Sequence, residues 1–470
     1  MRTLIWAAAI GLAGGFAVSS AKAQPRHDIC ADVGGNFAWG VSLFGSAEYG
    51  DHDTWAQRAE HASGADWRFT YVYILPGANE WYIRYKADIA ADVGAIPVYT
   101  FYEVLKLAEM AGVTGTEQER VQRGLMNPGV MSTYYDNFIM LLQVAATLPP
   151  PVLVHVEPDT FGFMMWAFGT PGLDDATRVP VQVAGSGNAE VAGFADNAAG
   201  FSQALLALRD RYAPEVRMGW HASNFRGGMS ADVVTRFYGS LDSSWDVIVS
   251  ESPHNEADEA TWWNPWDEAL VARNLDWMRT VSEAAGVPML LWQVPIGATD
   301  YHMIGDWSDT TMVQRYAEAG VAGAMFEHLG TGDPDTFRAT QGPAIGTPPP
   351  ASSPAGGTAA DMRARVAAYS VRPFAFTPAS RCGGSPPPPR DAGPPRDAGP
   401  PPPPVDGGTV AGADAASVLP GTDGGSAGSS TATGGCGCAT TAPAPTGLGG
   451  VGLGLVGALV WARRRRDRRR

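Results

Sequence analysis

The chain has 470 residues, of which 45% are apolar and 10% aromatic, enough to build a large hydrophobic core. Its 33 basic and 48 acidic residues give a formal net charge of −15, which argues against nucleic acid or an anionic membrane surface as a partner of the folded part. We expect that part to be a monomer.

Residues 1–23 are typical of a secretion signal. A basic residue, Arg2, precedes an apolar stretch from Leu4 to Val18, and Ala21-Lys22-Ala23 has the small-x-small pattern of a cleavage site. We therefore expect an exported protein, and we leave these residues out of the fold.

Residues 27–382 are predicted to form an α/β domain, a (β/α)8 TIM barrel. Between Asn36 and about Ser370, short apolar runs alternate with longer amphipathic segments, as in parallel strands connected by helices. The segments expected as strands are Phe37–Phe44, Trp67–Ile74, Ile96–Tyr102, Val152–Glu157, Val216–His221, Trp245–Glu251, Pro288–Val294 and Gly323–Leu329. The segments expected as helices are Trp55–Ala62, Tyr85–Val93, Ser132–Leu148, Ala198–Tyr212, Ala231–Leu241, Pro265–Ala285, Thr311–Ala319 and Ala359–Tyr369.

The connection after the fourth strand, from Thr160 to about Asn197, is unusually long. It is rich in Gly and Pro, carries the aromatic patch Trp166–Phe168 and shows no clear helical period. Long connections inside compact domains are usually functional or disordered, so we expect a wall or lid of a cleft.

Two of the four cysteines flank the predicted barrel. Cys30 precedes the first strand and Cys382 follows the last helix. Because a closed barrel brings its first strand beside its last helix, and exported proteins meet oxidising conditions, we predict a disulfide bond between them.

The composition changes abruptly after about Ser380. Pro, Gly, Ala, Ser and Asp dominate, with the near-repeat PPPPRDAGPPRDAGPPPPP at Pro386–Pro404. Such a segment buries too little apolar surface to fold, so we predict a disordered linker over residues 383–433 that is dispensable for activity.

Residues 434–470 combine three features in order: the motif GGCGC at Gly434–Cys438, the apolar stretch Leu448–Ala462 and the terminal run RRRRDRRR. This arrangement resembles the MYXO-CTERM sorting tail of myxobacterial surface proteins. The resemblance implies a transmembrane segment as the only membrane contact, and a sorting protease acting near Cys436 or Cys438. It also implies display at the cell surface or outer membrane, with release as the alternative.

Polar side chains gather where the predicted strands end. Glu103 follows the third strand, Glu157 and Asp159 the fourth, His221 ends the fifth, Glu251 the sixth, Trp292 and Gln293 the seventh, and Glu327 and His328 the eighth. TIM-barrel active sites lie at the C-terminal strand ends. Paired carboxylates there suit glycoside hydrolysis, in which one acid protonates the leaving oxygen and a second carboxylate acts as nucleophile or base.

The segment HVEPDTFG, starting at His155, resembles the strand-end EPD motif of family-6 cellulases, and the layout resembles TIM-barrel glycoside hydrolases. Both resemblances imply a polysaccharide or oligosaccharide substrate. The large retaining clan of β-glycosidases keeps its nucleophilic glutamate after the seventh strand, where this chain has Gln293. Clans that include α-galactosidases pair the fourth and sixth strands instead. We prefer that pairing.

The catalytic residues are therefore predicted to be Glu157, Asp159 and Glu251, with Glu327 as the competitor for the second carboxylate. Pro158 should keep the chain extended, so that Glu157 and Asp159 share a face with His155, itself expected to be a hydrogen-bonded core residue. Glu157 would then be the proton donor and Asp159 would tune it. Substrate-binding roles are predicted for Glu103, His221, Trp292, Gln293 and Glu327.

No metal ion or cofactor is expected. The acidic segments Asp51–Asp53 and Glu251–Glu259 could bind calcium but lack a ligand spacing. The chain has no serine nucleophile elbow, phosphate loop, dinucleotide fingerprint or HExxH motif. The alternative to an enzyme is a noncatalytic carbohydrate-binding barrel or surface adhesin, which the missing glutamate after the seventh strand favours.

Overall fold

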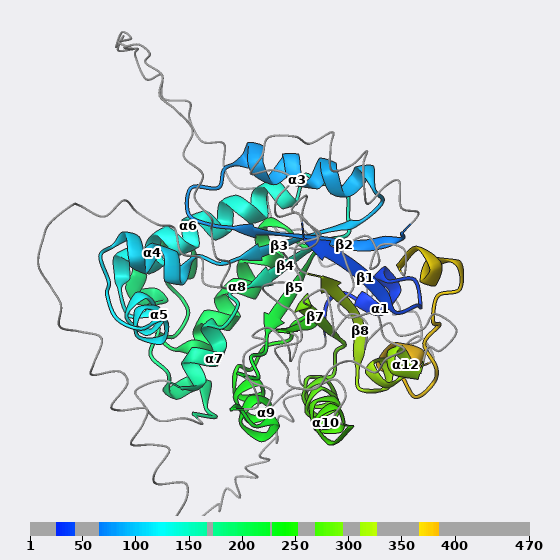
Figure 1. Ribbon diagram of the computed structural model, residues 1–470. Coiled ribbons are helices and arrows are strands. Elements are labelled where there is room, and N and C mark those ends of the chain that lie inside the picture. The colour runs from blue at the N-terminus through cyan, green and yellow to red at the C-terminus, as the bar shows by residue number, and fades with distance from the viewer. Residues whose placement is uncertain are drawn as a thin grey trace, which may run out of the picture. The chain divides into compact units, whose positions relative to one another are not determined.

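Eight parallel strands form a closed barrel in the order of the chain, and the eighth strand pairs with the first (Figure 1). The computed structural model describes residues 25–42, 65–166, 173–225, 228–251, 268–294, 311–326 and 366–384. The strands are β1 Ala38–Ser42, β2 Trp67–Ile74, β3 Ile96–Phe101, β4 Val152–Val156, β5 Val216–His221, β6 Val247–Glu251, β7 Met289–Val294 and β8 Val321–Phe326. The predicted eight-stranded barrel is confirmed.

Helices surround the barrel and connect consecutive strands (Figure 1). Those with described bounds are α1 Ile29–Asp32, α3 Glu80–Asp92, α4 Val104–Met110, α5 Glu117–Leu125, α6 Pro128–Ala145, α7 Thr160–Met165, α8 Ala198–Tyr212, α9 Ala231–Ser240, α10 Glu268–Ala285 and α12 Thr311–Glu318. Short 3-10 helices lie at Ala176–Arg178, Ala184–Ser186, Ala189–Val191 and Arg381–Gly383.

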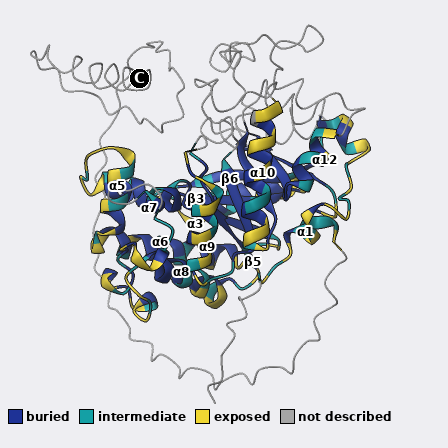
Figure 2. Ribbon diagram, turned by 90° about the horizontal axis from the view of Figure 1, so that it is seen from below, coloured by how far each residue is buried: buried dark blue, intermediate teal, exposed yellow. Residues whose placement is uncertain are grey.

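The strands are buried on both faces, which explains their nearly continuous apolar sequences. Along β4, Val152, Val154 and Val156 pack in the large core that also holds residues of the surrounding helices. Leu153, of opposite parity, belongs to a second apolar cluster built mainly from strand residues. His155 shares that inward parity. Figure 2 shows the buried strands enclosed by helices whose exposed residues lie on their outer sides.

Several helices begin where the sequence offers a side-chain cap. Asn79 accepts a hydrogen bond from the N–H of Tyr82 at the start of α3, and Thr116 and Glu119 form a reciprocal capping box at the start of α5. Asn127 caps α6, whose first residue is Pro128. These caps supply acceptors for N–H groups that have no partner within the helix.

The structure differs from the sequence prediction mainly between β3 and β5. Helices α4, α5 and α7 were not predicted, and α6 begins at Pro128 rather than Ser132. The long connection Thr160–Asn197 starts with the short helix α7 and continues through three 3-10 helices. Its predicted role as a wall or lid stays a prediction.

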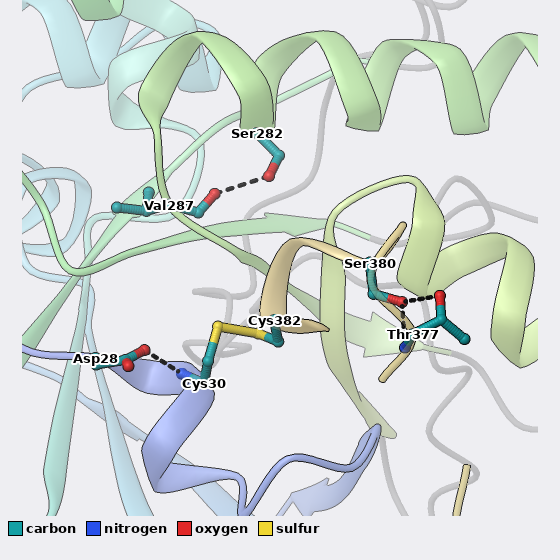
Figure 3. The surroundings of a disulfide bond; sticks show 7 residues. All are labelled: Asp28, Cys30, Ser282, Val287, Thr377, Ser380 and Cys382. Carbon is teal, nitrogen blue, oxygen red and sulfur yellow. Dashed lines mark hydrogen bonds between the residues drawn. A yellow bond between two sulfur atoms is a disulfide. The ribbon is translucent and has the colours of Figure 1, made fainter. Parts of the chain in front are cut away.

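The two ends of the barrel domain are tied together, as predicted, by a disulfide bond between Cys30 and Cys382 (Figure 3). Backbone pairing supports the same junction, since the N–H of Phe37 donates to the carbonyl of Phe374. The Tyr369 hydroxyl, in the α-helical segment of residues 366–371, donates to the Phe37 carbonyl.

Several predictions concern residues outside the described part of the chain. They include the signal peptide, the sorting tail and all but the first two residues of the linker. Within the described ranges, no helix is both long enough and apolar enough to span a bilayer.

Removal of the disulfide bond should lower the stability of the barrel. The bond closes a loop with a sequence separation of 352 residues, and loop-entropy models assign such loops about 6 kcal/mol, although measured values are often smaller. We predict that Cys30→Ser with Cys382→Ser lowers the midpoint of thermal unfolding measured by circular dichroism. Reducing agent should lower the midpoint of the wild type and leave the double variant unchanged. Equal midpoints for the wild type and the variant would contradict a stabilising role.

Candidate active site

The C-terminal ends of β4, β5 and β6 bring three of the predicted residues together. His221 Nε2 lies 3.2 Å from Glu251 Oε2 and 3.9 Å from Asp159 Oδ1. One ligand atom from each of the three residues lies within 4.8 Å of the others. We call this group the mouth triad. It places two carboxylates and an imidazole at the end of the barrel where TIM-barrel chemistry occurs.

Glu251 is held by the connection that follows β5. Its Oε1 accepts hydrogen bonds from the backbone N–H groups of Asn224, at 2.6 Å, and Phe225, at 3.0 Å. Its other oxygen faces His221, and its side chain is 10% exposed. The carboxylate is therefore fixed in direction while part of it stays accessible.

Asp159 is the most open member of the mouth triad, with 35% of its side chain exposed. Its Oδ1 accepts a hydrogen bond from the Ser223 hydroxyl at 3.3 Å. Burial of the carboxyl raises the pKa of Asp159 to about 6, and the negative charge of Glu251 adds to this shift. Asp159 thus combines access to solvent with a proton that is retained up to about pH 6, well above the ordinary range of an aspartate.

Glu157 occupies a different position from the one predicted. Its Oε1 accepts from the N–H groups of Glu103, at 2.9 Å, and Val104, at 3.2 Å, while Oε2 accepts from the Thr160 hydroxyl at 2.9 Å. The side chain is fully buried, and its φ of 50° ends the strand alternation at Val156. The expectation that Glu157 and Asp159 share one face is wrong, because positive φ angles at both residues redirect the chain.

Burial raises the pKa of Glu157 to about 8, and its three hydrogen bonds act in the opposite direction. Glu103 lies next to it and is only 1% exposed, with a 2.6 Å hydrogen bond from Asn137 Nδ2. Burial raises the pKa of Glu103 to about 7. Both acids are buried, and Glu103 is turned toward Asn137 of α6, so its position does not support the predicted contact with substrate.

Aromatic rings line the barrel beside the mouth triad. Trp292, which is 2% exposed, packs edge-on against Tyr73, with ring centroids 5.7 Å apart, and against His221 at 5.7 Å. Gln293 Nε2 donates to the Tyr73 hydroxyl at 2.6 Å. The Tyr102 hydroxyl donates to Glu117 at 2.9 Å. Trp292 and Gln293 are therefore buried neighbours of Tyr73 at the end of β7, and their predicted role in substrate binding stays a prediction.

Most of the described non-glycine residues with strained, positive φ angles lie at the C-terminal ends of the strands. Five described residues other than glycine have positive φ, and four of them, Glu157, Asp159, Phe225 and Gln293, follow or end β4, β5 and β7. Such conformations cost energy and often cluster at functional sites. Sequence reasoning missed Tyr73, Ser223 and Glu117, and no motif singles them out. Glu327 and His328 lie outside the described residues, as do Asp51–Asp53 and most of the acidic segment after Glu251.

The mouth triad also has the composition of a metal-binding group. Among the described residues, Asp159, His221 and Glu251 could hold a divalent cation through one nitrogen and two carboxylate oxygens. Their side chains already contact one another and Ser223. The three residues can therefore serve either acid–base chemistry or cation binding, and an experiment can distinguish the two roles.

No protein-family model matches the chain, and no curated protein is similar to it in sequence. Solved structures with a similar fold include an endo-β-1,4-mannanase double mutant from Cellulomonas fimi, at 13% identity and a TM-score of 0.41 over 73% of this chain and 76% of the mannanase. A β-galactosidase from Rahnella sp. R3 matches at 11% identity and a TM-score of 0.40, over 64% of this chain and 51% of its own. A β-glucosidase from Thermotoga maritima matches at 8% identity and a TM-score of 0.35, over 62% and 88%. The likeness concerns the fold alone and assigns no site residue.

The burial of Glu157 leads to a prediction about stability. Because its pKa is about 8 in the folded state and near 4.5 in the unfolded chain, its contribution to stability is complete below that lower value and is lost as the pH rises through 8. Glu157→Gln cannot ionise, and its amide oxygen can still accept the two N–H bonds. We predict a smaller drop in the unfolding midpoint between about pH 5 and pH 9 than in the wild type.

The exposed Glu283 on α10 provides a matched control, since Glu283→Gln makes the same chemical change away from the mouth. This variant should follow the wild-type curve in thermal denaturation. A pH dependence for Glu157→Gln as steep as that of the wild type would show that ionisation of Glu157 does not weaken the fold.

Proposed function

We propose that this protein is a glycoside hydrolase in which Asp159 donates the proton and Glu251 is the second carboxylate. The observation that carries the proposal is the convergence of these two carboxylates and His221 within 4.8 Å at the C-terminal strand ends. It keeps the predicted pairing of the fourth and sixth strands. It replaces Glu157 by Asp159 as donor, because Glu157 has no exposed surface.

The two carboxylates have the different environments that this reaction needs. Asp159, with its pKa raised to about 6, holds a proton that can pass to the glycosidic oxygen as that bond breaks. Glu251 is directed by two backbone N–H groups and faces His221. Retaining enzymes place their carboxyl groups about 5–5.5 Å apart and inverting enzymes about 6.5–9.5 Å, so the close approach supports Glu251 as a nucleophile and retention of configuration.

The substrate is proposed to be a polysaccharide or oligosaccharide outside the cell. The partly exposed ring of Tyr73, which packs on the buried Trp292 beside the mouth triad, suits the apolar face of a sugar. Export and display at the cell surface rest on the sequence features of the two termini. The disulfide bond between Cys30 and Cys382 agrees with an oxidising compartment.

A noncatalytic carbohydrate-binding barrel is the second candidate. The observation that favours it is the amide of Gln293, which donates to the Tyr73 hydroxyl at the end of β7. An amide cannot act as the nucleophile that many barrel glycosidases carry on this strand. Under this proposal the same mouth would bind a sugar chain without cleaving it.

Substitution of either proposed catalytic carboxylate tests the enzyme. We predict that Asp159→Asn and Glu251→Gln each lower kcat/KM by roughly 10²–10⁴-fold on a polysaccharide that the wild type cleaves, because each removes acid–base or nucleophilic chemistry and preserves shape. Release of reducing ends measures the rate, and proton NMR of the first product identifies its anomer. Asp276→Asn, 76% exposed on α10, is the matched control and should keep wild-type activity.

The same assay also shows which results would contradict the proposed enzyme. Since the donor must be protonated, activity should decline as the pH rises above about 6. EDTA should leave turnover unchanged; a loss that added divalent cations restore would make the mouth triad a metal site instead. If the wild type bound polysaccharides from a panel of different sugars and linkages but cleaved none of them, the noncatalytic barrel would be supported. Full activity of Asp159→Asn would exclude Asp159 as the donor.

An exposed tryptophan on α3, stacked on a neighbouring tyrosine, offers a test of the substrate class. Trp81 is 67% exposed, and its ring stacks on Tyr85 with centroids 5.1 Å apart and an interplanar angle of 10°. Because α3 follows β2, its first turn lies toward the barrel end that carries the mouth triad. We predict that Trp81→Ala raises KM on the polymer about threefold to tenfold, as expected for one lost stacking contact.

Activity on a short oligosaccharide should stay unchanged in this variant, because a short ligand does not extend to α3. Met110→Ala serves as the control. Met110 ends α4 and is 74% exposed, so this change also shortens an exposed apolar side chain. Equal KM values on the polymer for Trp81→Ala and the wild type would remove Trp81 from the binding surface.

A further inference from the structure

A row of buried polar groups crosses the barrel from β3 to β6 and ends at Glu251. Thr100 Oγ1 lies 3.2 Å from His155 Nδ1, His155 Nε2 lies 2.8 Å from His221 Nδ1, and His221 Nε2 lies 3.2 Å from Glu251 Oε2. Thr100, His155 and His221 are fully buried. The row uses both nitrogens of both imidazoles, so each ring has one partner on either side.

The positions of the protons follow from the chemistry at the two ends of the row. A carboxylate only accepts hydrogen bonds, so the proton of neutral His221 must lie on Nε2, facing Glu251. Nδ1 of His221 is then an acceptor, and His155 must donate to it from Nε2. His155 Nδ1 in turn accepts from the Thr100 hydroxyl. Every hydrogen bond in the row therefore points toward Glu251.

Burial favours the neutral form of His155 that this assignment requires. It lowers the pKa of His155 well below its ordinary value, with a further contribution from the neighbouring His221. The titratable groups that face His221 from the described elements are His155 on β4, Asp159 after β4 and Glu251 on β6. Trp292 of β7 packs edge-on against both imidazoles, with centroid distances of 5.1 Å to His155 and 5.7 Å to His221.

We propose that Thr100 and His155 are positioning residues that hold His221 in the tautomer with its proton on Nε2, so that His221 donates to Glu251. The inference rests on the proposed function only in taking Glu251 as a catalytic carboxylate. The opposite tautomer would set a bare nitrogen against a carboxylate oxygen and leave buried acceptors unpaired, which is costly. The row thereby fixes the position of Glu251 Oε2 through His221, while the N–H groups of Asn224 and Phe225 fix Oε1.

The tautomer can be measured without a substrate. Nitrogen-15 NMR of the full chain labelled at histidine distinguishes protonated from bare ring nitrogens, and His155→Gln and His221→Gln would assign the two signals. We expect a proton on Nε2 and a bare Nδ1 in both His155 and His221 of the wild type. A wild-type His221 with its proton on Nδ1 would overturn the proposal, whether or not the protein hydrolyses any glycan.

Variants at Thr100 separate positioning from packing. Thr100→Val keeps the shape and removes the hydroxyl donor, whereas Thr100→Ser keeps the donor in a smaller side chain. We expect Thr100→Val to mix the tautomers of His155 and His221 and to lower kcat about twofold to tenfold with KM nearly unchanged, as for the loss of one hydrogen bond. Thr100→Ser should keep both the wild-type tautomers and kcat.

Val98 lies two residues before Thr100 on the same strand and supplies a control for packing, through Val98→Ala. It should lower the unfolding midpoint and leave the nitrogen-15 signals in place. If Thr100→Val kept wild-type nitrogen-15 signals, or if Thr100→Ser changed them as much as Thr100→Val does, the hydroxyl would not set the tautomer. If the tautomers mixed and kcat stayed constant on a cleaved substrate, the row would have no positioning role in the reaction.

Discussion

Two glutamates hold the mouth of the barrel by accepting backbone hydrogen bonds from the neighbouring connection. Glu157, after β4, accepts from two N–H groups that follow β3, and Glu251, at the end of β6, accepts from two that follow β5. In each case the acid of an even-numbered strand satisfies donors that would otherwise be buried without partners. The rest of the site depends on these bonds, because they fix the start of α4 and the connection that brings Ser223 to Asp159. In this arrangement Glu157 is fully buried, whereas 10% of the Glu251 side chain is exposed.

The sequence predicted the features that follow from burial and periodicity. Continuous apolar runs located the eight strands, because strands covered on both faces tolerate few polar residues, and the strand ends located Asp159, His221 and Glu251. The cysteine positions gave the disulfide bond. Helix α5 was missed although its capping box, Thr116 to Glu119, is readable in the sequence. The direction of Glu157 was not predictable, because it depends on positive φ angles at non-glycine residues that only tertiary contacts can maintain.

The burial of acids in this barrel has an electrostatic consequence. Glu103, Glu157 and Asp159 all have raised pKa values, and burial is the largest cause in each case. These three acids differ in how far their side chains are exposed to solvent. The first two are almost completely enclosed, whereas a third of the Asp159 side chain is open. A raised pKa therefore identifies a candidate acid only when the same group can also reach a substrate.

The bond between Cys30 and Cys382 has a consequence for how the barrel withstands cleavage of its backbone. It joins residues on either side of all eight strands, so the barrel domain is a single covalent ring. One peptide bond cut in any surface connection of a ring leaves one molecule, not two. The strands on either side of the cut would stay tethered at high effective concentration, and the barrel could close again around its site.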